Sequence, residues 1–227
     1  MRNRILLLVT FCGLIASAWA QSNFNRYTYN AGLGLGIGKD DVASYVGNSF
    51  QGVVGAGMNF NRMFGMDAEY MYYNLDFRPS VIRSQSLADQ SGRMHSISLD
   101  GIVNVPRHIG KLGAYGIFGL GFYDRSVGLA HSQLLLNNTP MQPAWRWWDL
   151  NWVAIANGPV IFNPAPPYGE TMSSNSKVAG GFNYGGGVTY RLNSLHHAKV
   201  YLEWRYHRAY QADGQTIVMP ITVGLRW

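Results

Sequence analysis

The residues that could do chemistry are charged side chains at every second position of largely apolar stretches. This spacing puts them on one face of a β-strand and their apolar neighbours on the other. Buried charges must pair, so such a shared face predicts a salt-bridged network. A narrow gated ion path and an acid–base site are alternatives that the spacing does not separate. The set comprises Asp67, Glu69, Asp100, Arg191, Lys199, Glu203, Arg205 and Arg226.

Two other patterns could bind a cofactor or a metal, and both are weak. The stretch Gly32-Leu33-Gly34-Leu35-Gly36 is rich in glycine, but a phosphate-binding loop must open a helix and no helical pattern follows. His196 and His197 are adjacent on a predicted turn, and two histidines without a third ligand do not make a zinc site. We therefore expect neither a cofactor nor a metal.

The N-terminus has the pattern of a cleaved export signal. A basic start and a short apolar run precede the small-residue site Ala18-Trp19-Ala20, so we predict a signal peptide at residues 1–20 with cleavage after Ala20. The only cysteine, Cys12, lies inside this signal. Removing the signal takes two of 18 basic residues and leaves 16 against 12 acidic ones, a net charge of +4. No dense run of Lys and Arg is present, which argues against nucleic acid as a partner.

After the signal, apolar residues alternate with polar residues or glycine in eight stretches. Their ranges are 29–38, 50–60, 64–72, 96–105, 113–124, 177–192, 198–207 and 214–227. No run of about 18 apolar residues remains to form a membrane helix. The connections alternate between long and short, and the longer ones are 39–49, 77–93, 126–176 and 209–214. Outer-membrane barrels combine an even strand number with short periplasmic turns and longer outer loops.

This pattern predicts an all-β fold, an eight-stranded antiparallel up-and-down transmembrane β-barrel with one long outer loop. Both termini then lie in the periplasm, apolar side chains face lipid, and glycines and charges face the lumen. Side chains just fill the interior of an eight-stranded barrel, so the eight charged residues become a predicted barrel-interior charge network. A soluble lipocalin-like barrel would instead bury the aromatic face and expose the glycines.

The last strand ends the chain on an aromatic residue. Val223, Leu225 and Trp227 complete an alternation that begins at Ile217. This ending resembles the C-terminal assembly signal of bacterial outer-membrane barrels, and the resemblance implies the β-barrel assembly machinery as a partner. Pro220 lies within this strand, and because proline has no N–H we expect a local bulge or a missing hydrogen bond there.

The longest connection, residues 126–176, carries a tryptophan cluster of Trp145, Trp147, Trp148 and Trp152. Within it, Asn157-Gly158 stands between two short apolar runs and predicts a hairpin. Loops of this length are usually functional or disordered, and aromatics together with prolines argue against disorder. The cluster is therefore a candidate interaction surface for an extracellular glycan or protein ligand. The alternative is a self-packed lid over the barrel or against lipopolysaccharide.

The mature chain as a whole resembles the small outer-membrane barrels typified by the OmpA transmembrane domain and the opacity-type surface proteins. The resemblance rests on the signal peptide, the glycine-rich first strand, Leu112 to Phe122, and Ile217 to Trp227. It implies one barrel domain at residues 21–227 in the bacterial outer membrane, in contact with outer-membrane lipid and lipopolysaccharide. It also implies a non-enzymatic envelope-structural or surface-interaction role. A small-solute channel is the alternative.

A lipid A-modifying hydrolase is a more distant alternative. Trp204-Arg205-Tyr206-His207 is similar to the strand that carries the catalytic histidine of outer-membrane lipid A deacylases, and His207 would lie near the outer rim. That family has a serine two residues after the histidine, where this chain has Ala209. A serine–histidine hydrolase without its nucleophile lacks the attacking group, so we expect no enzyme.

Overall fold

The computed structural model describes residues 25–78, 90–106, 110–129, 134–136, 139–146, 149–154, 173–192, 198–211 and 214–227. The predicted signal peptide and its cleavage site after Ala20 lie outside these residues, as do His196 and His197. In the described part of the chain, no helix has the length and apolar character needed to cross a membrane.

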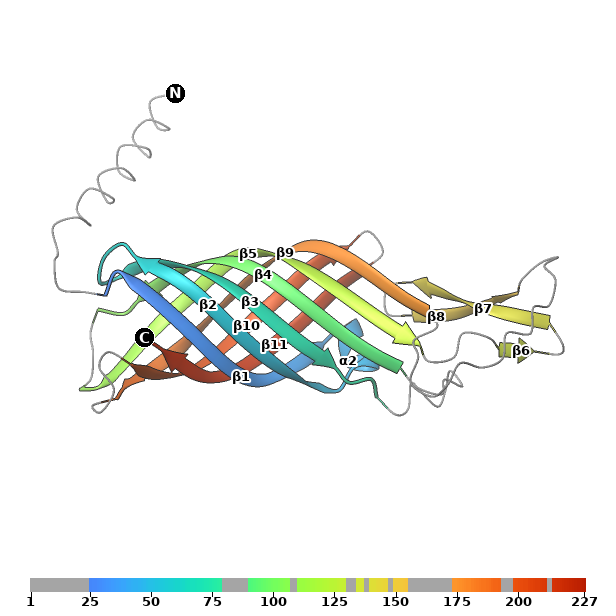
Figure 1. Ribbon diagram of the computed structural model, residues 1–227, viewed down its shortest axis with the longest axis horizontal. Coiled ribbons are helices and arrows are strands. Elements are labelled where there is room, and N and C mark those ends of the chain that lie inside the picture. Colours follow the sequence, from blue (N-terminus) through green and yellow to red (C-terminus); the bar gives the residue numbers. More distant parts are fainter. Residues whose placement is uncertain are drawn as a thin grey trace, which may run out of the picture.

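Eight antiparallel strands close into a barrel, as the alternation predicts (Figure 1). They are β1 (Tyr27–Lys39), β2 (Asn48–Asn59), β3 (Phe64–Leu75), β4 (Gln90–Asn104), β5 (Leu112–Leu129), β9 (Ser173–Arg191), β10 (Lys199–Gln211) and β11 (Gly214–Arg226). Around the barrel their order is β1-β11-β10-β9-β5-β4-β3-β2, so each strand pairs with its neighbours in the barrel sequence and the first meets the last. Tyr29 and Trp227 complete this closure, because each donates its backbone N–H to the other's carbonyl oxygen, at 2.8 and 3.0 Å.

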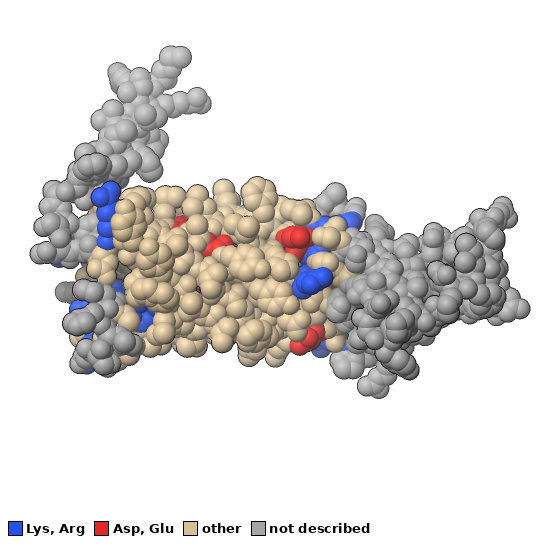
Figure 2. All heavy atoms as spheres, in the orientation of Figure 1, with Lys and Arg blue, Asp and Glu red and all other residues tan. Residues whose placement is uncertain are grey.

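The outward face of the barrel is apolar. Leu120 and Phe122 are 72% and 70% exposed. In water, hydrophobic stabilisation of roughly 25 cal/mol would be lost for each Å² of apolar surface left uncovered. The side of the barrel shown in Figure 2 is largely uncharged along its middle, with Lys and Arg gathered toward its two ends. Other strongly exposed apolar side chains on this face are Leu33, Leu35, Val54, Ile97, Leu99, Phe118, Val178, Val188 and Val223. Such a surface is the one that lipid covers.

The two ends of the barrel differ in their connections. We call the end that holds connections 60–63, 105–111 and 192–198 and Trp227 the turn end, and the end that holds connections 40–47, 76–89, 130–172 and 212–213 the loop end. The regular alternation of long and short connections is wrong in one place, because only residues 212–213 separate β10 from β11. Residues 209–211 belong to β10, whose inward alternation continues to the buried Ala209.

Three predicted loops contain regular structure. Residues 39–49 include the short helix α2 (Asp41–Tyr45) and the start of β2. Residues 90–93, predicted as loop, open β4. In the long connection, β5 continues to Leu129 and β9 begins at Ser173, because the two strands stay paired as far as Leu129 and Ser173.

A separate three-stranded sheet lies within the long connection, beyond the loop end in Figure 1. It is built from β6 (Leu134–Leu136), β7 (Thr139–Arg146) and β8 (Asp149–Ala154). Val153 and Ala154 pair with β7, opposite Gln142 and Met141. The predicted hairpin turn at Asn157-Gly158 lies outside the described residues.

Pro220 interrupts one ladder without shifting its register. Between β10 and β11, Trp204 pairs with Ile221 and the next pair is His207 with Val218, so two pairs are missing and no residue is inserted. The opposite ladder is continuous, with Gly36 facing Pro220. The expected loss of hydrogen bonding is confirmed. The expected bulge is wrong, because a strand can lack the N–H of one proline without containing an extra residue.

Candidate functional site

The candidate site is the lumen, and Arg205 lies at the centre of its charged part. Arg205 Nε donates to Glu203 Oε1 at 2.5 Å, and Nη1 donates to Asp100 Oδ2 at 2.9 Å. Its Nη2 forms a third ion pair, with Glu69 Oε2. The three acids come from β10, β4 and β3, so one guanidinium fork ties together opposite sides of the barrel.

Amide and hydroxyl groups donate further hydrogen bonds to the carboxylates, although Asp67 Oδ1 is buried without a partner. Asn30 Nδ2 donates to Asp67 Oδ2 at 2.5 Å and to Glu69 Oε1 at 2.9 Å. Asn183 Nδ2 donates to Asp100 Oδ1 at 2.8 Å, and Ser98 Oγ donates to Asp100 Oδ2 at 2.8 Å. Buried charges are tolerated when their partners are arranged in this way, whereas removal of one member strands the others.

A second arginine lies next to this cluster on the side of the turn end. Arg226 Nη2 is 3.9 Å from Glu203 Oε2, and that oxygen accepts a hydrogen bond from Tyr115 Oη at 2.6 Å. The guanidinium of Arg226 also lies over two rings, 4.6 Å from the centroid of Tyr115 and 5.3 Å from that of Tyr201. Cation–π contacts of this kind hold an arginine in one orientation.

Six of the eight residues of the predicted charge network are thus brought together in the lumen, namely Asp67, Glu69, Asp100, Glu203, Arg205 and Arg226. The other two are not part of the cluster. Lys199 is half-buried and Arg191 is exposed, both at the turn end. Alternation gives the face that a residue occupies but not its depth, and the register of β9 and β10 puts these two cations at the rim.

The sequence reasoning missed several buried polar residues. Arg125 is 1% exposed on β5, where it continues the inward alternation of Tyr115 and Tyr123. The alternation would have found Arg125 if the fifth strand had been extended past residue 124. The alternation also puts Asn30 and Asn183 on the inward face, but nothing in their spacing identifies the carboxylates that they bind.

Glycines make room for the charge cluster. A Cβ on Gly119 would overlap Asp100 Oδ1, and a Cβ on Gly55 would lie 2.7 Å from Asn30 Nδ2 and from Glu69 Cγ. A Cβ on Gly185 would lie 3.0 Å from Arg205 Cγ and closer still to the neighbouring backbone. The inward glycines of β2, β5 and β9 therefore allow three bulky ion-pairing side chains to share one narrow lumen.

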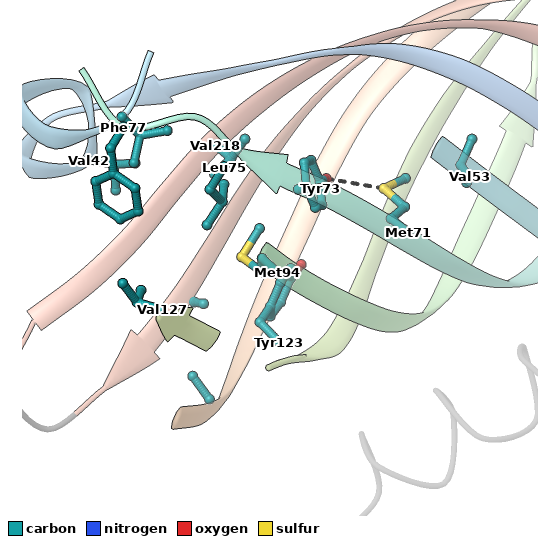
Figure 3. Close-up of a cluster of buried hydrophobic side chains, with 13 residues drawn as sticks. Val42, Val53, Met71, Tyr73, Leu75, Phe77, Met94, Tyr123, Val127 and Val218 are labelled. Atoms are coloured by element: carbon teal, nitrogen blue, oxygen red, sulfur yellow. Dashed lines mark hydrogen bonds between the residues drawn. The ribbon is translucent and has the colours of Figure 1, made fainter. Parts of the chain in front are cut away.

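The loop-end half of the lumen contains a large apolar cluster, which differs from the expectation that glycines and charges face the lumen, and the buried Arg125 and His207 lie in the same half. Figure 3 shows this apolar plug, which we define by its 13 buried residues: Val42, Val46, Val53, Met71, Tyr73, Leu75, Phe77, Met94, Tyr123, Val127, Ala179, Ala209 and Val218. Within it, Tyr73 Oη donates to Met71 Sδ at 3.2 Å. Every barrel strand except β1 contributes a side chain, and β1 contributes the inward Gly36, where a Cβ would lie 3.1 Å from Tyr73.

The helix α2 closes the top of the apolar plug. Val42 on α2 and Val46 directly after it are 1% and 2% exposed. Val46 forms a β-bridge with Phe77, and the backbone N–H of Gly47 donates to the carbonyl of Asp76 at 2.8 Å. The segments before β2 and after β3, two neighbouring strands, are therefore held together at the mouth of the barrel.

His207 lies inside the lumen rather than at a lipid-accessible rim. It is 2% exposed, and its Nδ1 is 2.9 Å from the hydroxyl of Tyr123. The ring of Tyr73 meets it edge-on at 6.4 Å between centroids. Its partner is a phenol and not a serine hydroxyl, so the arrangement is not that of a serine–histidine nucleophile. Within the described residues, no three His, Cys, Asp or Glu side chains converge to hold a metal.

The remaining candidates are the tryptophan cluster and the C-terminal residues. Trp145 is on β7 opposite Leu150, and Trp152 is on β8 opposite Pro143. Trp147 and Trp148 lie outside the described residues. Val223 and Leu225 on β11 and Trp227 directly after it are 54%, 43% and 47% exposed.

Described side chains fill the lumen in two layers. A cluster of ion pairs crosses it in one half, and a close-packed apolar layer crosses it in the other. Water-filled pores require a polar, continuous lumen, which larger barrels provide.

Comparison with known proteins places this architecture in a family. The sequence matches the family model of the outer membrane protein beta-barrel domain over residues 5–227. Among solved structures, Neisserial surface protein A is similar at 12% identity and a TM-score of 0.56, over 88% of this chain and 95% of that one. A major outer membrane protein from Thermus thermophilus is similar at 11% identity and a TM-score of 0.53, over 89% of this chain and 98% of that one.

Ail, the attachment invasion locus protein of Yersinia pestis, has 14% identity and a TM-score of 0.47, over 90% of this chain and 100% of its own. Curated protein sequences give no significant match. Identities this low show a shared fold alone, whereas the family match spans almost the whole chain. Together with the lipid-facing band and the closed barrel, it places the protein in the bacterial outer membrane. The chain belongs to the outer membrane protein beta-barrel domain family.

Proposed function

We propose that this protein is a closed, non-enzymatic barrel that holds an extracellular element at the cell surface. Its role is envelope-structural or surface-interacting, in contact with outer-membrane lipid and lipopolysaccharide. The tryptophan cluster of the long connection is the proposed contact with an extracellular glycan or protein ligand. Val223, Leu225 and Trp227 are the proposed signal for the assembly machinery.

The observation that carries the proposal is the double closure of the lumen. Arg205 is 1% exposed and forms ion pairs with acids on three strands, and Val42 above the apolar plug is also 1% exposed. A solute would have to displace both layers to pass. This favours a closed barrel over the small-solute channel.

The loop end supports a role outside the membrane. β9 pairs with β10 only from Gly180 onward, so its earlier residues 173–179 extend beyond β10 and are paired only with β5. The β6–β8 sheet lies farther out along the same axis in Figure 1. Because outer-membrane barrels turn their longer loops outward, this extension would project from the cell.

The test uses the full chain in planar lipid bilayers and in vesicles. We expect no steady open-state conductance from the wild-type protein. A variant in which residues 130–172 are replaced by a short Gly/Ser linker should be equally non-conducting, because the plug and the ion pairs lie outside that segment. A stable conductance from the wild type would contradict the proposal and favour the channel.

The surface role has its own readout. Vesicles carrying the wild type should bind to components of a glycan or protein array, and the linker variant should not. A Trp145→Ala/Trp152→Ala variant is the matched control, because it keeps the length of the segment. Binding that is the same for all three proteins would contradict the proposed contact.

A further inference from the structure

Three cations line the lumen mouth at the turn end, and the charge cluster does not use them all. Lys199 on β10 lies directly opposite Arg191 on β9 and directly opposite Arg226 on β11. Directly opposed residues of antiparallel strands share a face, with Cβ atoms about 4.5–5.5 Å apart. All three follow the inward alternation of buried residues, which includes Tyr201, Glu203 and Arg205 on β10. The mouth therefore carries a row of positive side chains.

Arg226 is fixed in this row with unused hydrogen-bond donors. Its side chain is only 9% exposed, and its Nε and Nη2 are buried without a hydrogen-bond partner. The rings of Tyr115 and Tyr201 hold its guanidinium in place. Buried donors normally find an acceptor, and each that does not is costly. A preorganised arginine fork with free donors is suited to an oxyanion.

The acids of the barrel do not neutralise this row. Glu203 is the nearest carboxylate, but its two oxygens accept hydrogen bonds from Arg205 and Tyr115, and it approaches Arg226 no closer than 3.9 Å. Among the described residues, no carboxylate lies within ion-pair distance of Lys199 or Arg191. Lys199, flanked by a cation on each side, is repelled by both unless an anion lies between them.

We propose that the turn-end mouth of the lumen binds a phosphoryl group, held by the fork of Arg226 and by Lys199 and Arg191. A phosphoryl group offers three acceptor oxygens and a multiple negative charge, which matches three donors arriving from adjacent strands. Because the Arg205 cluster closes the lumen just above, the group enters from the periplasm and does not cross the barrel. It comes from a free phosphate or from the headgroup of an inner-leaflet phospholipid.

The experiment titrates the full-length protein in a maltoside detergent, which contains no phosphate. Inorganic phosphate is one probe, and phosphatidylglycerol in mixed micelles is the other, with binding followed by calorimetry and by native mass spectrometry. Arg191→Gln/Lys199→Gln is the test variant, because both side chains lie at the rim and their loss leaves the ion pairs of Arg205 intact. Arg62→Gln is the matched control, since Arg62 is an exposed cation of the same barrel end on the β2–β3 turn.

We expect saturable binding to the wild type, weakened about tenfold or more in the double variant and unchanged in Arg62→Gln, because each lost charge-assisted contact removes a substantial part of the affinity. Arg226→Lys, which keeps the charge but loses the fork, should also weaken binding. Saturation by inorganic phosphate alone identifies a free anion, and saturation by phosphatidylglycerol that phosphate displaces identifies the lipid headgroup. Absence of saturable binding to both probes, or equal weakening in Arg62→Gln, would overturn the proposal.

Discussion

Replacement of Glu203 by leucine tests whether the ion cluster stabilises the barrel. The change removes the acceptor of Arg205 Nε at 2.5 Å and of Tyr115 Oη at 2.6 Å. It also removes the carboxylate that lies 3.9 Å from Arg226. Breaking a buried ion pair costs about 3–5 kcal/mol, and a stranded buried hydroxyl costs about 1–3 kcal/mol.

Two effects reduce the sum of these costs. Arg205 keeps its contacts with Glu69 and Asp100, and the change removes the repulsion between Glu203 and the remaining carboxylates. We therefore expect Glu203→Leu to lower the free energy of unfolding by about 3 kcal/mol. Glu203→Gln is the matched control, because its amide oxygen keeps an acceptor for Arg205 Nε and its amide N–H can donate to Tyr115 Oη, and it should lose about 1–2 kcal/mol.

The measurement is urea unfolding in lipid vesicles, followed by tryptophan fluorescence and by gel mobility without heating. A double-mutant cycle with Tyr115→Phe isolates the hydrogen bond to Glu203 and should give a coupling energy of about 1 kcal/mol. If Glu203→Leu lowers the free energy of unfolding by less than about 0.5 kcal/mol, the ion cluster does not stabilise the barrel through Glu203, because Glu203 is then hydrated like a surface charge. Strict additivity in the cycle would show that the Tyr115 contact contributes nothing.

Four further outcomes follow from the same structure. Mass spectrometry of the exported protein should give a chain that starts at Gln21, and an uncleaved chain in the membrane would contradict the predicted signal. Trp227→Ala should lower the amount assembled in the outer membrane several-fold while barely shifting the urea midpoint, because the backbone bonds of residue 227 are kept and its ring is half exposed; normal assembly would remove the signal role. Replacing residues 130–172 by a short linker should leave heat-modifiable gel migration intact, since the paired barrel strands lie outside the segment; failure to fold would show that the barrel needs it. Gly119→Ala should lower the free energy of unfolding by about 1–3 kcal/mol in the urea assay, because its Cβ would overlap Asp100. Gly180→Ala, with open space around its Cβ, should be nearly neutral. Equal effects would contradict the conclusion that the inward glycines make room for the charge cluster.

The sequence alone determined which face of each strand meets lipid and how many strands close the barrel. Period-two alternation assigns every residue to one of two faces, and a chain with apolar residues on one face and glycines or charges on the other has few ways to bury itself. For this reason the inward positions of Asp67, Glu69, Asp100, Glu203 and Arg205 could be predicted without coordinates. The missing ladder bonding at Pro220 followed equally from the chemistry of one residue.

The closed barrel, and not the sequence pattern, sets how deep in the lumen each side chain lies and which groups it contacts. Alternation does not tell how far along the barrel a residue lies, because depth depends on the stagger of each strand against its neighbours, which closure of the barrel fixes. Thus Arg205 forms ion pairs with acids on three strands, whereas Arg191 and Lys199, which the alternation places on the same face, lie at the rim. The apolar plug under α2 escaped prediction for a related reason. In each single strand, the Met, Tyr and Val residues of the plug form part of an ordinary two-residue alternation. They become a core only because seven strands and a short helix bring them together.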